Sequence, residues 1–457
     1  MGGQHITGNF GTVYRDYLVN YLADGTKGSA DLVAYFYLRA FSLLRNGGDF
    51  GLIACNTIAE GTTRQVGLEQ IVKMDGTIYS AYPNMPWPGT AGVAISPVFM
   101  CKGEWHGKMR LDGSEVKMVS PFLSAQDEWT PQVLVANANQ SFQGSIVLGM
   151  GFTMSEEEAL DLIEKDPKNA DVLFPFLSGE DLNSDSFQRP SRRVVNFFDW
   201  PIERAKQYTY VFAIIEEKVK PERQRLKPSG EYVLRKPLPE KWWMYGEKRP
   251  ALYHAIGRGN MFDKHPLLWK EDKFRPYVFA TSLHSKYFIP TRTKNDAVYS
   301  HALAIIAPPN IVNETVLYSS VLSVWVWKQG SSLESRLRFT PSDCYETFPF
   351  PLSPLPQLEL LGEQFDEHRR KIMFTRQIGL TALYNLFHNQ AEKDAELEEM
   401  RRLQREIDIA VRDSYGWQDI DLEHDFHVVG YLPANDNVRY TISEPARIEI
   451  QIGRAHV

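Results

Sequence analysis

The sequence predicts an α/β fold, namely the second half of a doubly wound sheet, followed by an α+β domain and a helical C-terminal region. Helix and strand patterns alternate through the first hundred residues. Short strands, proline turns and many aromatic residues then mix between 170 and 350, and apolar residues recur at helical spacing beyond 357. These observations predict three domains, at 1–105, 106–352 and 353–457.

The clearest early helix pattern spans 30–45 and ends at Asn46-Gly47-Gly48, residues that suit a left-handed helix end. The uninterrupted apolar run 50–55 follows, and such a run is typical of a strand that is buried on both faces. After a further helix, strands are predicted at 77–82 and 91–100, which form a hairpin-like pair. This order of helices and strands is that of the second half of a doubly wound domain.

The loop between the last two of these strands contains Trp87 between closely spaced prolines. Pro83, Pro86 and Pro88 each fix a backbone φ angle, so the loop is stiff and holds Trp87 in one pose at low entropic cost. Two interpretations of the residue pattern remain open. Trp87 is either a platform on which a planar ring stacks or a plug for the end of the sheet.

The features of a cofactor-binding first half are missing from the sequence. No glycine-rich turn follows a leading strand, and no acidic residue lies about 20 positions beyond one. An open α/β sheet binds its ligand where the strand order reverses, with strands from both halves. We therefore expect this chain to lie on one side of such a site.

Later segments are predicted from caps, prolines and periodicity. Ser155 and Glu158 have the spacing of a capping box and predict the start of a helix. The proline-rich joint at 349–356 predicts a domain boundary, because residues before proline resist the helical conformation. Amphipathic helices are predicted at 358–389 and 395–415.

Composition excludes several classes of protein. Of 457 residues, 43% are hydrophobic and 23% charged, values of an ordinary globular chain rather than a disordered or fibrous one. Three widely spaced cysteines exclude a disulfide scaffold and a cysteine-based zinc site. His424 and His427 have no further ligands nearby, so we expect no metal. Because no segment resembles a membrane span or a signal peptide, we expect a soluble cytoplasmic protein without a membrane partner.

Charge is unevenly distributed along the chain. Residues 201–300 contain 20 Lys and Arg against 11 Asp and Glu, a net charge of +9, whereas the whole chain has −7 and the remainder therefore −16. Aromatic residues interleave with these cations, and this combination suits phosphates and bases, although most of the aromatic residues are expected in the core. The candidate DNA-binding cations are Arg249, Arg258, Lys270, Arg275 and Lys286.

Several ordered segments resemble a known family. Segments 29–36, 51–64 and 86–89 are similar to the methylase part of fused restriction–modification adenine methyltransferases of the type IIG kind. That family's target-recognition region resembles four later segments, at 141–145, 179–183, 249–250 and 337–344. The resemblance covers nearly the whole chain.

The resemblance implies a class I methyltransferase sheet followed by a DNA target-recognition domain. The family transfers a methyl group from S-adenosylmethionine to N6 of an adenine that is flipped out of double-stranded DNA. Trp87, followed by Pro88, lies where the family places the aromatic side chain that stacks on the flipped base. The resemblance therefore favours the stacking interpretation of Trp87, and it implies a restriction nuclease domain, fused or associated.

The chain also departs from the family pattern. The catalytic Asn-Pro-Pro-aromatic motif is expected just upstream of Gly2, and the S-adenosylmethionine loop farther upstream, so neither lies in this chain. The last six residues, from Ile452, resemble a translated sequencing adapter. We expect a truncated fragment that does not methylate DNA on its own.

Two alternatives come from other classes of function. A stand-alone DNA-specificity module would read sequence and borrow catalysis from a separate methylase or nuclease partner, and the missing motifs favour it. The methylase-like strands argue against it, because a pure reader has no use for half a methylase sheet. An RNA methyltransferase is disfavoured by the large domain that follows, which suits duplex recognition.

Overall fold

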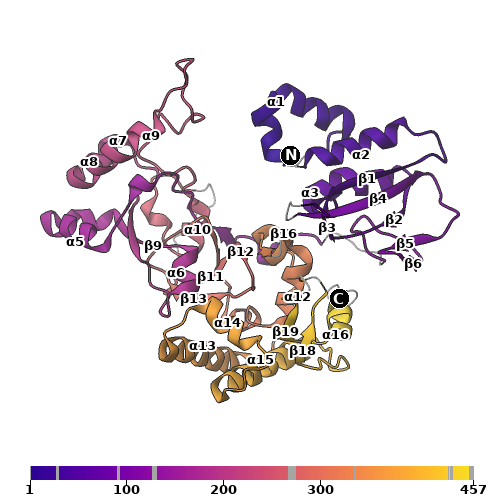
Figure 1. Ribbon diagram of the computed structural model, residues 1–457. Coiled ribbons are helices and arrows are strands. Elements are labelled where there is room, and N and C mark those ends of the chain that lie inside the picture. Colours follow the sequence, from indigo (N-terminus) through magenta and orange to yellow (C-terminus); the bar gives the residue numbers. More distant parts are fainter. Residues whose placement is uncertain are drawn as a thin grey trace. The chain divides into compact units, whose positions relative to one another are not determined.

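The chain forms two compact units. The computed structural model describes residues 2–26, 30–89, 93–125, 131–265, 274–333, 336–430, 432 and 436–451. Unit 1 comprises residues 1–131 and 331–334, and unit 2 comprises residues 132–330 and 335–457. Each unit has its own hydrophobic core. The fold is mixed α/β, with several separate sheets (Figure 1).

Unit 1 is built on one sheet with helices packed on it (Figure 1). Its helices are α1 (Gly3–Tyr17), α2 (Leu32–Leu43), α3 (Gly61–Arg64) and α4 (Gln70–Lys73). Its strands are β1 (Asp49–Cys55), β2 (Gly76–Ala81), β3 (Met85–Pro86), β4 (Ala94–Lys102), β5 (Met109–Leu111) and β6 (Ser114–Val116). The order of strands is β1-β4-β2-β5-β6, and β3 pairs with β4.

Strand β4 is the centre of this sheet. It runs antiparallel to both β1 and β2, so these two strands point in the same direction on either side of it. Because the helical segment between β1 and β2 joins two strands of the same direction, it is a crossover connection. The predicted sequence of helix, strand, helix, strand and strand is thus observed, and the predicted hairpin-like pair is β2 with β4.

The prediction that the first strand is buried on both faces is wrong for the described chain. Among the described strands only β4 pairs with β1, and the side chain of Ile53 is 60% exposed. One face of β1 still packs inward, where the Tyr37 hydroxyl of α2 donates to the Leu52 carbonyl oxygen at 2.9 Å. On the other face Gly51 makes room for the ring of Phe99, which a Cβ would approach to 2.6 Å.

Unit 2 contains two four-stranded sheets, with orders β14-β9-β10-β8 and β13-β11-β15-β7. It also contains an antiparallel pair of β12 with β17, which are distant in the chain, and a hairpin of β18 with β19. Its strands are β7 (Ser141–Gln143), β8 (Thr153–Met154), β9 (Leu173–Leu177), β10 (Arg192–Val195), β11 (Tyr277–Ser282), β12 (His284–Ser285), β13 (Thr291–Lys294), β14 (Val298–Tyr299), β15 (Leu303–Ile306), β17 (Arg336–Arg338), β18 (Asp425–Val428) and β19 (Val438–Thr441).

Helices surround these sheets and share one core with them. They are α5 (Glu156–Lys165), α6 (Gly179–Ser184), α7 (Ile202–Ala205), α8 (Thr209–Lys218), α9 (Lys220–Arg223), α10 (Pro250–Ala255), α11 (Ile311–Val316), α12 (Ser320–Gln329), α13 (Gln357–Arg376), α14 (Leu380–Phe387), α15 (Ala395–Ser414) and α16 (Glu444–Glu449). The capping box at the start of α5 is confirmed, since Ser155 and Glu158 exchange hydrogen bonds of 3.1 and 2.8 Å.

The region after 353 is helical but differs from the prediction in two ways. The single helix predicted at 358–389 is two helices, because Gln377 adopts a left-handed conformation with φ 51° and ends α13. Gly379 then starts α14, and a Cβ there would lie 2.3 Å from the carbonyl oxygen of Asn183. The hairpin of β18 and β19 was not predicted.

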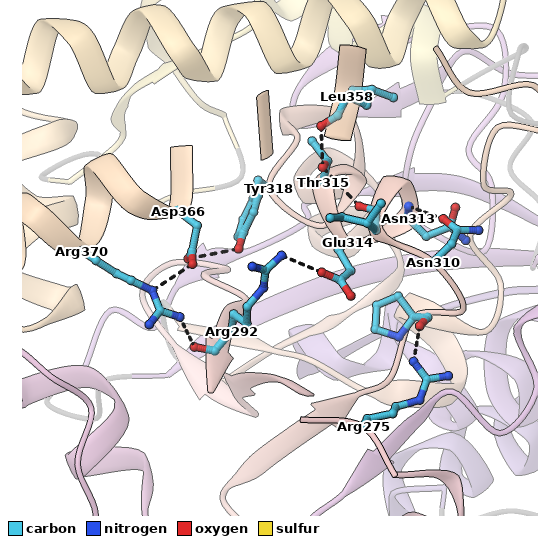
Figure 2. A network of polar contacts seen from close by, with 12 residues as sticks. Arg275, Arg292, Asn310, Asn313, Glu314, Thr315, Tyr318, Leu358, Asp366 and Arg370 are labelled. Carbon is cyan, nitrogen blue, oxygen red and sulfur yellow. Dashed lines mark hydrogen bonds and ion pairs between the residues drawn. The ribbon is translucent and has the colours of Figure 1, made fainter. Parts of the chain in front are cut away.

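A buried charged network attaches α13 to the rest of unit 2 (Figure 2). The Asp366 carboxylate accepts hydrogen bonds from Tyr318 at 3.2 Å, Arg369 at 2.9 Å and Arg370 at 2.8 Å. Arg370 also donates to the carbonyl oxygen of Arg292 in β13 at 2.7 Å. Every oxygen of this buried carboxylate therefore faces a donor, which offsets the cost of removing its charge from water.

Candidate functional site

The carboxyl edge of the sheet in unit 1 gathers several of the segments singled out by sequence. Cys55, the last residue of β1, and Met85 in β3 both pair with Ile95 near the start of β4. The end of β1 and the loop after β3 therefore flank the same point of β4, about 10 Å apart at the usual spacing of strands. In open α/β sheets, ligands bind beyond the carboxyl ends of the strands.

Trp87 lies directly after β3 at this edge. Its backbone N–H donates to the carbonyl oxygen of Val93 at 3.0 Å, which fixes the start of the loop. Its indole is 43% exposed, and Pro88 beside it is exposed too. Gly89 lets the chain pass the ring closely, because a Cβ there would lie 2.5 Å from the indole nitrogen. An exposed, held indole has a face available for stacking, and its role stays a prediction.

Asp31 links three further segments at this edge. Its carboxylate accepts the backbone N–H of Gly3 at 3.1 Å and the hydroxyl of Thr57 at 3.3 Å. Its own N–H donates to the hydroxyl of Thr63 at 3.1 Å. Asp31 is the N-cap residue of α2, but its carboxylate binds neighbouring segments instead of capping that helix. The start of α1 is thereby held beside the residues that follow β1.

Three of the five candidate cations have their charged groups engaged within unit 2. Arg258 donates to the carbonyl oxygen of Ala297 at 2.7 Å. Arg275, which Figure 2 shows, donates to the carbonyl oxygen of Pro308 at 2.6 Å. Lys286 forms an ion pair of 2.8 Å with Asp436. Burial lowers the pKa of Lys286, but hydrogen bonds to Asp436 and Tyr287 outweigh it, and the pKa is raised. Their contact with DNA stays a prediction.

Arg249 lines an open cleft, whereas Lys270 lies outside the described residues. The cleft has a volume of about 370 Å³ and lies where β7 meets the start of α10. One Arg249 nitrogen donates to the side-chain oxygen of Gln143 at 2.9 Å, and another lies 3.9 Å from the Glu247 carboxylate. Sequence reasoning missed Glu247, although it lies only two residues before Arg249 in the chain.

The aromatic residues of the basic region divide as expected between core and surface. Among those described, six are buried, namely Tyr208, Trp242, Trp243, Tyr245, Tyr253 and Tyr287. Tyr210, Phe274 and Tyr277 are about half exposed. Most of these rings therefore stabilise the fold, and only the exposed ones offer a face to a ligand.

Two other predicted features concern metals and membranes. Within the described part of the chain, no group of three or more His, Cys, Asp or Glu side chains is placed to bind a metal ion. His424 instead contacts the buried Asp408 carboxylate at 2.8 Å. No helix in the described ranges is both long enough and apolar enough to cross a membrane.

Comparison with known proteins gives a match at the level of fold. No protein-family model matches the chain, and no curated protein matches it. Its structure is similar to that of the type IIL restriction-modification enzyme MmeI, solved in complex with DNA, with a TM-score of 0.61 and 17% sequence identity over 88% of this chain. The type IIG restriction endonuclease BpuSI aligns with a TM-score of 0.29 and 11% identity, over 89% of this chain and 52% of that enzyme. The match to MmeI covers 51% of that enzyme. The chain thus has the fold of about half of a type IIL restriction-modification enzyme.

Proposed function

We propose that this chain is the target-base and DNA-recognition part of a site-specific DNA methyltransferase in a restriction–modification system. The intact enzyme transfers a methyl group from S-adenosylmethionine to N6 of a flipped-out adenine in double-stranded DNA, with a nuclease fused or associated. The observation that carries this proposal is the exposed Trp87 at the carboxyl edge of the sheet, beside the end of β1. The fold shared with an enzyme solved in complex with DNA supports it.

Trp87 has a defined task in this proposal. An adenine inside a duplex hides N6, so the base has to leave the stack at a cost of a few kcal/mol. Stacking on an aromatic ring returns about 1–3 kcal/mol per base. Pro88 and the hydrogen bond of Trp87 to Val93 hold the indole in place before the base arrives. Unit 2, with its basic segment, then binds the duplex.

The described residues do not fit S-adenosylmethionine by themselves. In proteins that bind nucleotide cofactors, a glycine-rich turn typically follows a strand, and an acidic residue lies farther along the chain. Residues 56–59 after β1 form a short helical turn without glycine. The carboxylate of Asp31 at the same edge already accepts two hydrogen bonds. The described residues at this edge therefore lack the groups that would hold the cofactor, and methyl transfer by this chain alone is not expected.

Purified chain is expected to bind duplex DNA weakly and to transfer no methyl group. Because the basic segment acts through phosphates, the affinity should fall steeply between 50 and 200 mM salt. Fluorescence anisotropy with labelled duplexes measures the binding, and radiolabelled S-adenosylmethionine measures transfer. Failure to bind DNA at low salt would contradict the DNA-binding proposal. Transfer of label to DNA would contradict the view that cofactor binding needs further residues.

The second candidate is a stand-alone DNA-specificity module, favoured by the absence of a cofactor loop from the sequence. The genomic DNA upstream of the Met1 codon, read in frame, separates the two candidates. An Asn-Pro-Pro-aromatic motif preceded by a glycine-rich strand and turn supports the methyltransferase. A stop codon and a ribosome-binding site at that place support the specificity module.

A further inference from the structure

Unit 2 contains a second hollow, a cavity of about 80 Å³ that shares no lining residue with the cleft at Arg249. It lies where α12, α14, α15 and β19 meet the segment that follows β12. Most of the residues that line it are buried, among them Ser319, Gln404 and Arg439 at 1%, 7% and 7% exposure. A cavity of this volume has room for several water molecules. It is therefore large enough for a small ligand, but it cannot admit a DNA duplex.

The lining of this cavity is positively charged. It includes the side chains of Lys286 and Arg439, and none of the described residues that line it is an aspartate or a glutamate. Both cations share the carboxylate of Asp436, which lies outside the lining, 2.8 Å from Lys286 and 3.2 Å from Arg439. One carboxylate does not neutralise two cations, so a positive charge remains beside the cavity.

The guanidinium of Arg439 has donors left for a ligand. Its Nη1 donates to Asp436 at 3.2 Å and to the carbonyl oxygen of Val438 at 2.8 Å. Nε and Nη2 have no acceptor in the part of the chain that the structure describes. These two nitrogens form one edge of the guanidinium, and such an edge presents parallel N–H bonds that match the two oxygens of a carboxylate or a phosphate.

His388 contributes a neutral donor to the same cavity. Burial, together with the positive charges of Arg439, Lys286 and Arg401, holds the pKa of His388 well below its usual range. Its Nδ1 accepts the backbone N–H of Tyr440 at 3.2 Å. In a neutral imidazole the other nitrogen then carries the proton. Nε2–H of His388 is therefore a donor, and it has no acceptor among the described residues.

These three side chains surround the ring of Tyr287. The guanidinium of Arg439 lies 5.0 Å from the ring centroid, the ammonium of Lys286 lies 5.1 Å from it, and the His388 ring stacks at 5.0 Å. They come from β19, from the segment after β12 and from the residue after α14. Three distant segments thus bring nitrogen donors to one cavity, without an acidic side chain in its described lining.

We propose that this cavity binds a small oxyanion, such as inorganic phosphate or a short carboxylate, through Arg439, Lys286 and His388. Arg439 donates to two oxygens of the anion from its Nε–Nη2 edge, Lys286 adds charge, and His388 donates from Nε2. The bound anion ties the β18–β19 hairpin to α14 and so stabilises unit 2. The proposal does not depend on DNA binding, and it gives Lys286 a role other than the DNA contact expected from sequence.

Isothermal titration calorimetry of the full chain tests the proposal, with sodium phosphate and sodium acetate titrated separately at constant ionic strength. We expect one binding site for at least one of these anions, and the tighter of the two identifies the group that the cavity prefers. At a hundredfold excess over its Kd, that anion should raise the Tm of unit 2 by roughly 5 °C.

Two variants and a matched control locate the bound anion. Arg439→Gln removes the guanidinium edge and should weaken binding at least about 10-fold. His388→Asn keeps an oxygen that accepts the N–H of Tyr440 but lacks Nε2–H, so it should weaken binding too, and it remains informative if Arg439→Gln fails to fold. The control Arg235→Gln removes an exposed cation outside the cavity and should leave the affinity unchanged. Circular dichroism identifies any variant that does not fold.

Three results would overturn the proposal. Binding of neither anion would show that the cavity holds only water. Equal affinity of the wild-type chain, Arg439→Gln and His388→Asn would place the anion elsewhere on the chain. Displacement of bound phosphate by a short DNA duplex would assign the three donors to the DNA backbone. The first two results would leave the proposed DNA-binding function untouched, because that function is measured with DNA alone.

Discussion

Replacing Asp366 by Ala is expected to lower the free energy of unfolding of unit 2 by about 3–5 kcal/mol. The substitution leaves the guanidinium of Arg369 buried without its ion-pair partner. It also removes the acceptor of the Tyr318 hydroxyl (Figure 2). Urea unfolding followed by far-UV circular dichroism measures the change. Asp366→Asn, which keeps the shape, should be intermediate, because its amide still accepts one hydrogen bond.

Acid should weaken the same network. Burial alone would raise the pKa of Asp366, but Arg369 and Arg370 outweigh it and hold this pKa below its usual range. The carboxyl group thus binds its proton more weakly in the folded than in the unfolded chain. Its stabilisation is complete above pH 4 or so and is lost as the pH falls below the ordinary aspartate pKa of about 3.9. The variant Asp366→Ala should lack this component of acid sensitivity.

The control for both measurements is Glu367→Ala, an exposed carboxylate one residue farther along α13. It should change the free energy of unfolding by less than about 0.5 kcal/mol. Equal stability of Asp366→Ala and the wild-type chain at neutral pH would show that the network contributes nothing to unit 2, contrary to its burial and hydrogen bonding.

Replacing Trp87 by Ala is expected to weaken binding by about 5- to 150-fold when the target adenine of the DNA is already unpaired. This is the range of one base–aromatic stack. Trp87→Phe should retain most of the affinity, because a smaller ring still stacks. Fluorescence anisotropy measures the affinity for duplexes with a mismatch at the target adenine and for the matched duplexes. 2-Aminopurine at the target position is an independent probe, since its fluorescence changes when the base leaves the stack of its neighbours and when it stacks on another ring.

An exposed ring elsewhere in unit 1 is the matched control for Trp87. Phe36 in α2 is 62% exposed, and Phe36→Ala should leave the affinity for both matched and mismatched duplexes unchanged. If Trp87→Ala bound the mismatched duplex as tightly as the wild-type chain, the indole would not be the platform for the target base.

Local sequence patterns predicted which helices and strands form better than they predicted which of these elements pack or pair with one another. The helix at 30–45 and the strand at 77–82 are found as α2 and β2, because periodicity and caps are encoded within a few residues. The insertion of β4 between β1 and β2 depends on pairing across dozens of residues, and no local pattern indicates it. For the same reason the apolar run 50–55 predicted a strand but not its exposed edge.

At the candidate site, too, the sequence predicted local features but not the tertiary contacts of the side chains. The stiff loop predicted an ordered Trp87, because prolines restrict the backbone locally. The basic segment could not show which cations have partners, since Arg275 reaches Pro308 and Lys286 reaches Asp436, 33 and 150 residues away in the chain. The acceptor that orients Arg249, Gln143, is likewise 106 residues distant. Charge counts therefore located the basic segment, but tertiary contacts decide which of its side chains are available.

Cys55, the last residue of β1, is a cysteine at the candidate site that can be labelled chemically. Cys55 is exposed, whereas Cys101 and Cys344 are buried, and burial raises the pKa of the Cys344 thiol to about 12. Because the thiolate is the nucleophile, an alkylating dye at mild pH should modify Cys55 first. A dye at Cys55 would lie roughly 10 Å from the Trp87 loop, by the spacing of strands. Arrival of a nucleotide at that edge then becomes visible as a change in emission, without any substitution in the chain.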